Sequence, residues 1–169
     1  MLRILLFACA MAAPSLAGAA QGIAFDGTDY RLARVSASDL ELANYYAPSQ
    51  TARRDEPTLS VRAFKGQRSV ENVIRAHLTQ VGPNLLDDPL TVRRENAVDD
   101  VVLISFAKTS DSKTVEYVLE RFARANDGVI SYRYAQRLAA DADVRPVLAR
   151  QPQRIEQLFR LNFAPREGM

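Results

Sequence analysis

The chain has 169 residues, of which 47% are hydrophobic and 25% charged, a composition typical of one folded domain rather than of a disordered chain. With 22 Lys and Arg against 20 Asp and Glu, the chain has no net field that would draw it onto nucleic acid or an anionic membrane. Its one cysteine, Cys9, and one histidine, His77, argue against a disulfide framework and against a zinc site.

The first twenty residues have the order of a secretory signal peptide. Arg3 supplies a positive charge, residues 4–13 form an apolar run, and residues 17–20 are small enough for the signal peptidase groove. The run is too short to cross a bilayer about 30 Å thick, which takes roughly 20 apolar residues. We expect cleavage after Ala19 or Ala20.

The leader therefore predicts a periplasmic mature protein without an integral membrane segment. The alternative is a lipoprotein acylated at Cys9, which follows Leu6-Phe7-Ala8. That site lies early, however, and the residues after Cys9 stay apolar instead of forming a polar tether.

The N-terminal part of the mature chain predicts three strands. Residues 22–25 and 30–35 flank Asp26-Gly27, a pair that is favoured where both turn positions need positive φ. Residues 40–46 alternate, and Pro48 follows them.

A loop, a fourth strand and a helix come next. Residues 49–57 are polar and without period, which predicts a loop, and residues 58–65 alternate as a strand does. Residues 69–81 predict a helix, because Ser69 is a good N-cap, apolar residues follow helical spacing, and Gly82-Pro83 stops the pattern.

Residues 90–95 and 101–107 predict two further strands, and residues 114–138 suit either a helix or a hairpin. Asn126-Asp127-Gly128 favours the hairpin, with Asp127-Gly128 as its two-residue loop. In that register one face is apolar and the other sets Glu116, Glu120 and Arg124 opposite Ser131, Arg133 and Arg137. Arg121 is the exception, because it lies on the apolar face beside Tyr134.

A short turn capped by Asp143 and a helix starting near Pro152 complete the prediction. We expect Ile155, Leu158 and Phe159 to be buried and Arg154, Gln157 and Arg160 to face solvent.

The elements together predict an α+β fold, a mostly antiparallel β-sheet packed by two main helices. The expected organisation is a signal peptide at 1–20, a single α+β domain at 21–163 and a frayed tail at 164–169.

The chain resembles small uncharacterised exported proteins of Gram-negative bacteria that have a PsbP-like or DcrB-like α+β sandwich. The resemblance covers about residues 40–160. It rests on Tyr-Tyr-Ala-Pro at 45–48, on the order of the elements, and on Gly-Val-Ile-Ser-Tyr-Arg-Tyr-Ala at 128–135. It implies a fold class that holds adaptors and subunit-stabilising proteins more than enzymes, and it supplies no catalytic motif.

No catalytic signature is present in the sequence. No serine lies in a Gly-x-Ser-x-Gly elbow, and the acidic pairs lack calcium-loop spacing. We therefore name no catalytic residue, no metal ligand and no cofactor. Any histidine chemistry has to pass through His77, whose helical position is equally explained by a partly buried structural histidine.

Aromatic and basic residues mark the candidate binding surface. Tyr45 and Tyr46 face opposite sides of one strand, so one of them is free to line an exposed sheet surface, and tyrosine is favoured at interfaces. The candidate binding residues are Tyr45, Tyr46, Arg53, Arg54, Arg133 and Arg137.

The sequence thus favours an exported, non-catalytic binding or adaptor protein, acting by contact with a ligand or with an envelope or secreted protein. An immunity or inhibitor protein is a special case of this hypothesis. The alternative is a cell-envelope hydrolase that uses His77 with a carboxylate.

Overall fold

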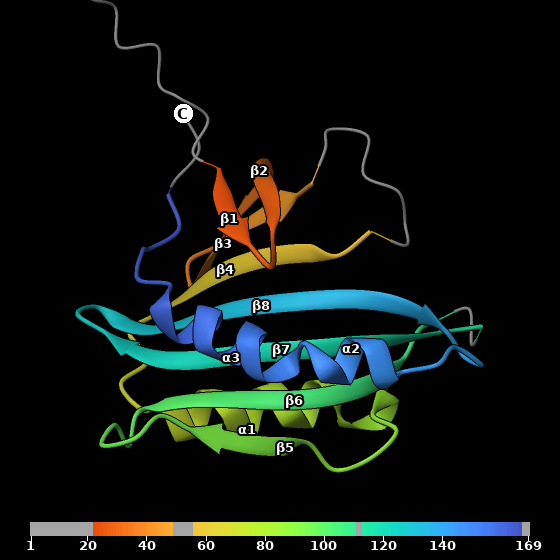
Figure 1. Ribbon diagram of the computed structural model, residues 1–169. Coiled ribbons are helices and arrows are strands. Elements are labelled where there is room, and N and C mark those ends of the chain that lie inside the picture. Colours follow the sequence, from red (N-terminus) through yellow and green to blue (C-terminus); the bar gives the residue numbers. More distant parts are fainter. Residues whose placement is uncertain (1–21, 49–55, 111–112, 167–169) are drawn as a thin grey trace, which may run out of the picture.

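The computed structural model describes residues 22–48, 56–110 and 113–166 (Figure 1). The predicted leader with Cys9, and the loop arginines Arg53 and Arg54, lie outside the described residues. The predicted tail is described only as far as Arg166.

The strands form one antiparallel sheet in the order β1-β2-β3-β4-β8-β7-β6-β5. The strands are β1 (Ile23–Phe25), β2 (Thr28–Ala37), β3 (Glu41–Ala47), β4 (Thr58–Lys65), β5 (Leu90–Arg93), β6 (Asp100–Lys108), β7 (Thr114–Ala125) and β8 (Gly128–Ala139).

Helices connect and cover these strands. They are α1 (Val70–Val81), the 3₁₀ turn η1 (Gly82–Asn84), α2 (Arg145–Ala149) and α3 (Gln151–Arg160). The α1 side and the α3 side are opposite faces of the sheet (Figure 1).

The prediction of a sheet packed by two main helices is wrong. Strand makes up 49% of the structure and helix 22%, in three helices over the described residues. The helix predicted to start near Pro152 is α3, of only 10 residues, and the short turn predicted before it is α2, of 5 residues. Each segment has a Pro in its first turn, Pro146 in α2 and Pro152 in α3, the position in which a helix accepts Pro best.

Local sequence signals account for the helix α1 and for the first turn. The Ser69 side chain accepts a hydrogen bond from the backbone N–H of Asn72 at 3.2 Å, which confirms the predicted N-cap. Asp26 and Gly27 both have positive φ, 52° and 76°, as the hairpin prediction requires.

The β7–β8 hairpin is confirmed, but its turn is one residue earlier than predicted. Ala125 pairs with Gly128, so the loop is Asn126-Asp127. Gly128 has a φ of 155°, and a Cβ there would lie 2.3 Å from the carbonyl oxygen of Phe64. The shifted register sets Arg121 opposite Tyr132 rather than Tyr134, while every side chain keeps its predicted face.

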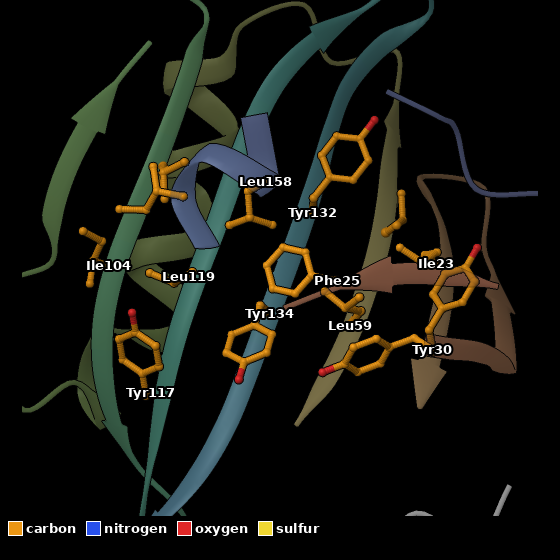
Figure 2. Close-up of a cluster of buried hydrophobic side chains, with 14 of the residues drawn as sticks. Ile23, Phe25, Tyr30, Leu59, Ile104, Tyr117, Leu119, Tyr132, Tyr134 and Leu158 are labelled. Atoms are coloured by element: carbon orange, nitrogen blue, oxygen red, sulfur yellow. The ribbon is translucent and has the colours of Figure 1, made fainter. Parts of the chain in front are cut away.

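The larger core lies on the α3 side of the sheet. Figure 2 shows Leu158 of α3 and Phe25 of β1 over the strands that carry Leu119 and Tyr134. The ring centroids of Phe25 and Tyr134 are 5.3 Å apart. The β1–β2 hairpin thus folds back over the sheet and shares one core with α3.

Arg154 corrects the predicted solvent-facing side of the last helix. Its side chain is buried, with the residue 4% exposed, and its Nε donates to Asp26 Oδ2 at 2.9 Å. The guanidinium also lies 4.8 Å from the centroid of the Tyr134 ring. Arg154 therefore joins α3 to the turn of the first hairpin, 128 residues away in the chain.

Candidate functional site

The strand register aligns polar residues in a row across the α1 side of the sheet. Tyr45 of β3 pairs with Ser60 of β4, Ser60 pairs with Arg133 of β8, and Arg133 pairs with Glu120 of β7. Directly paired residues in a sheet project from the same face. Residues far apart in the sequence therefore form one continuous surface.

Glu120 is the buried centre of a charge cluster on this side. It is 1% exposed and forms an ion pair with Arg62 of β4. Its Oε2 lies 3.9 Å from Nε of Arg133, and Arg133 also pairs with Glu116. Arg62 Nε donates to Ser131 Oγ at 3.3 Å. The sequence analysis placed Glu120 correctly on the charged face of this hairpin, but its side chain is buried there because α1 covers it.

His77 of α1 completes the cluster. Its Nε2 lies 3.4 Å from Glu120 Oε2, its side chain is 15% exposed, and its ring centroid is 5.5 Å from that of Phe122. Glu120 Oε2 is buried and has no hydrogen-bond partner among the described residues. Histidine and carboxylate thus converge, as the alternative function of the sequence analysis required.

The environment of the two groups determines which of them is charged at neutral pH. Burial lowers the pKa of His77, and the positive charges of Arg62 and Arg133 lower it further against the opposing effect of Glu120. Burial alone would raise the pKa of Glu120, but Arg62, His77 and Arg133 together hold it below its usual value. His77 is therefore neutral and Glu120 ionised.

A pocket of about 250 Å³ opens beside His77, between α1 and strands β3 and β4. We call it the α1 pocket. Its lining residues are Leu40, Glu41, Arg62, Phe64, Gln67, Asn72, Val73, Ala76, His77 and Gln80. These residues include no serine, threonine or cysteine that could serve as a nucleophile beside His77.

The part of this face that α1 does not cover carries exposed arginines. On this side α1 packs against Val101, Leu103, Phe122 and Val129, toward the β5 edge of the sheet. Over β2 and β3, at the other end of the sheet, no helix of the described ranges lies on this side (Figure 1). We call this surface the open sheet face and define it by Arg34, Tyr45, Ser60, Arg133 and Arg137.

Three of the predicted binding residues meet on the open sheet face. Tyr45 and Arg133 belong to the aligned row, and Arg137 follows on the same face of β8. Tyr46 does not join them, because it projects to the opposite side and is buried in the α3-side core. The predicted positions of Arg53 and Arg54 lie outside the described residues.

Sequence reasoning missed Arg34, whose guanidinium lies 4.1 Å from the centroid of the Tyr45 ring. The register of β2 shifts between Leu32 and Arg34, so Arg34 lies opposite Tyr45. A bulge of this kind has no reliable signal in the alternation pattern. The strand alternation of the sequence did indicate that Glu120 and Arg62 lie on the polar face. It gave no indication that these side chains are buried.

The described residues contain no helix long and apolar enough to cross a membrane. Within the same residues, no group of three or more His, Cys, Asp and Glu side chains is arranged to hold a metal ion.

Comparison with known proteins found no matching family, curated protein or solved structure. The resemblance to exported PsbP-like or DcrB-like proteins stays a prediction.

Proposed function

We propose that the protein is an exported, non-catalytic binding protein that contacts an acidic surface of another envelope protein through its open sheet face. The observation that carries this proposal is the set of arginines on that face. Arg34 and Arg137 are exposed, and neither forms an ion pair with any described residue. Their positive charges are therefore available to a partner.

The chemistry of the surface supports an acidic protein partner. Small side chains, among them Ala43, Ser60 and Ala135, lie on this face between the arginines and are themselves buried, so a partner would contact the larger arginine and tyrosine side chains that surround them. Tyr45, held under Arg34, supplies a rigid aromatic group. Arginine and tyrosine are the residues most enriched where protein interfaces concentrate their binding energy.

The site of action follows from the leader. A basic residue, an apolar run and small residues in that order support export, and the absence of cysteine after Cys9 suits a domain that folds without disulfides.

Affinity capture from a periplasmic extract tests the proposal. The bait is the mature chain, compared with an Arg34→Ala/Arg137→Ala variant and with an Arg75→Ala/Arg145→Ala control. The control removes the same charge from exposed positions elsewhere on the surface. We expect one protein to bind the wild type and the control and to be lost with the open-face variant. Capture that is equal for all three baits, or absent for all three, contradicts the proposal.

A second candidate, the cell-envelope hydrolase, is favoured by one specific observation, the 3.4 Å approach of His77 to buried Glu120. In this hypothesis His77 acts as a general base on water, oriented by Glu120. Hydrolysis of p-nitrophenyl acetate and butyrate by the wild type, abolished in a folded His77→Ala variant, would support it. Equal rates in the two proteins exclude the histidine mechanism.

A further inference from the structure

The α1 pocket adjoins the open sheet face and differs from it in chemistry. Its apolar wall is formed by Leu40, Phe64, Val73 and Ala76. Leu40 is 72% exposed, so its side chain is accessible at the edge of this concave surface. We propose that the α1 pocket anchors one large apolar side chain from an acidic peptide segment of the partner. This inference rests on the proposed function.

The pocket has the size of one side chain. Its volume of about 250 Å³ is below the 300–1,000 Å³ usual for pockets that enclose drug-sized ligands. Apolar anchors in small pockets, surrounded by groups that exclude water, carry most of the energy in many protein interfaces. The pocket therefore fits an anchor better than it fits a free metabolite.

Side-chain amides surround the apolar wall. Gln67, Asn72 and Gln80 line the pocket, and each carboxamide can both donate and accept a hydrogen bond. Backbone N–H and C=O groups of a peptide require that combination when they leave water. The lining thus favours a peptide over a hydrocarbon ligand such as an acyl chain.

The pocket and the open sheet face are continuous through Arg62. Arg62 lines the pocket, and Ser60 of the open sheet face is two residues earlier on the same strand, about 7 Å away. Likewise Glu41 lines the pocket and Tyr45 follows on the same face of β3. A peptide anchored in the pocket therefore reaches Arg34 and Arg133 within a few residues.

Charge fixes the composition of the segment on either side of the anchor. At the pocket itself, Arg62 is neutralised by Glu120, and Glu41 adds a negative charge. The free positive charges are those of Arg34 and Arg137 on the open sheet face. The acidic residues of the segment are thus expected to flank the anchor residue rather than to enter the pocket.

Titration of the mature chain with blocked amino acids tests the anchor directly. The probes are N-acetyl-leucinamide and N-acetyl-tryptophanamide, with N-acetyl-glycinamide as the probe without a side chain, followed by backbone amide NMR. With the two apolar probes we expect saturable shifts of the amide signals of Phe64, Val73 and His77. The glycine probe is expected to bind with an affinity at least about tenfold lower. No saturable shift, or equal binding of all three probes, overturns the inference.

Two matched variants locate the binding. Ala76→Phe fills the pocket from an exposed helical position, and Thr79→Phe adds the same ring at an exposed position outside its lining. Ala76→Phe is expected to abolish the shifts and Thr79→Phe to leave them unchanged. Equal behaviour of the two variants overturns the inference.

The captured partner separates this inference from the proposed function. Loss of partner binding with Arg34→Ala/Arg137→Ala but not with Ala76→Phe leaves the proposed function standing and overturns the anchor. Loss with Ala76→Phe as well supports both. A concentration-dependent dimer of the chain that Ala76→Phe abolishes would identify a second copy as the occupant, and would also overturn the inference.

Discussion

At the scale of single residues, Glu120 determines the character of the α1 side of the sheet. A buried carboxylate is tolerated only when opposite charges and hydrogen bonds replace its lost hydration. Arg62, Arg133 and His77 provide that environment from three different elements. The cluster is balanced in charge, which is expected of a support for the neighbouring surface more than of a reactive centre.

Replacement of Glu120 is expected to destabilise the fold strongly. Glu120→Gln removes the counter-charge of Arg62 and should lower the free energy of unfolding by about 3 kcal/mol. Glu71→Gln, which breaks an exposed i,i+4 pair with Arg75, is the control and should cost less than about 0.5 kcal/mol. Urea unfolding monitored by circular dichroism measures both. Equal small effects would show that Glu120 does not hold the cluster together.

The titration of His77 reports the same environment, and it gives a single signal because the chain has one histidine. Burial lowers its pKa below the ordinary 6.5, and Glu120 is the neighbour that opposes this shift. The pKa of His77 in NMR titrations should therefore be depressed, and lower still in Glu120→Gln. As the pH falls, the imidazole of His77 is protonated in the unfolded chain before it is protonated in the folded protein. The stabilisation that comes from burying the neutral imidazole is therefore present above pH 6.5 and is lost as the pH decreases below it. A pKa above 6.5 would contradict the geometry.

At the scale of elements, two features hold the α3-side core and its neighbouring hairpins in place. Asp26, in the turn between β1 and β2, pairs with Arg154 of α3 and with Arg150, the residue between α2 and α3. Gly128 brings the start of β8 against the backbone of β4. Each feature joins segments distant in sequence through one residue.

Two glycine substitutions are expected to differ in how strongly they affect stability. Gly128→Ala places a Cβ 2.3 Å from the Phe64 carbonyl oxygen at a φ of 155°, and should destabilise by about 2–3 kcal/mol. Gly82→Ala meets no other part of the protein within 4 Å, but Pro83 follows it and disfavours its helical conformation (φ −46°, ψ −44°) once a Cβ is present, so its effect should stay below about 1 kcal/mol. Thermal unfolding of both variants measures the difference. A neutral Gly128→Ala would refute the close approach of β4 and β8.

Sequence patterns predicted the local structure well and the long-range contacts poorly. The strand bounds of β4, the N-cap Ser69 and the faces of β7 and β8 follow from alternation and capping, which depend on neighbours in the chain. The burial of Arg154 and Glu120 depends on partners 128 and 58 residues away, Asp26 and Arg62 respectively. Periodicity counts any arginine or glutamate as solvent-facing, so it assigned both side chains to the wrong environment.

The candidate binding site, too, has a part that could be predicted from local sequence patterns and a part that could not. Tyr45, Arg133 and Arg137 could be predicted because alternation gives each its face. Their assembly into one surface depends on β4 lying between β3 and β8, which no local pattern specifies. Arg34 required the β2 bulge as well.

At the scale of the whole molecule, buried tyrosines set an alkaline limit to stability. Burial raises the pKa of Tyr134 to about 12 and raises that of Tyr30, Tyr117 and Tyr132 above the usual 10.0. The contribution of these buried tyrosines to the free energy of unfolding is complete below pH 10, where tyrosines of the unfolded chain are still protonated. It is lost as the pH rises toward 12.

The urea midpoint is therefore expected to fall steeply above pH 10, while phenolate absorbance of the folded protein lags behind that of the unfolded chain. Phenolate formation in all tyrosines of the folded protein near pH 10 would contradict their burial.

The molecule as a whole combines a curved sheet, a larger core on the α3 side, and an α1 side that is only partly covered. The uncovered part is where the free arginines lie, so the account depends on contact through that surface.

Calorimetric titration of the captured partner with wild type and with Arg34→Ala/Arg137→Ala, at low and at physiological salt, tests this most directly. The account predicts at least about tenfold weaker binding by the variant, and a smaller dependence on salt than for the wild type. Equal affinities with equal salt dependence would show that the arginines of this surface do not bind the partner.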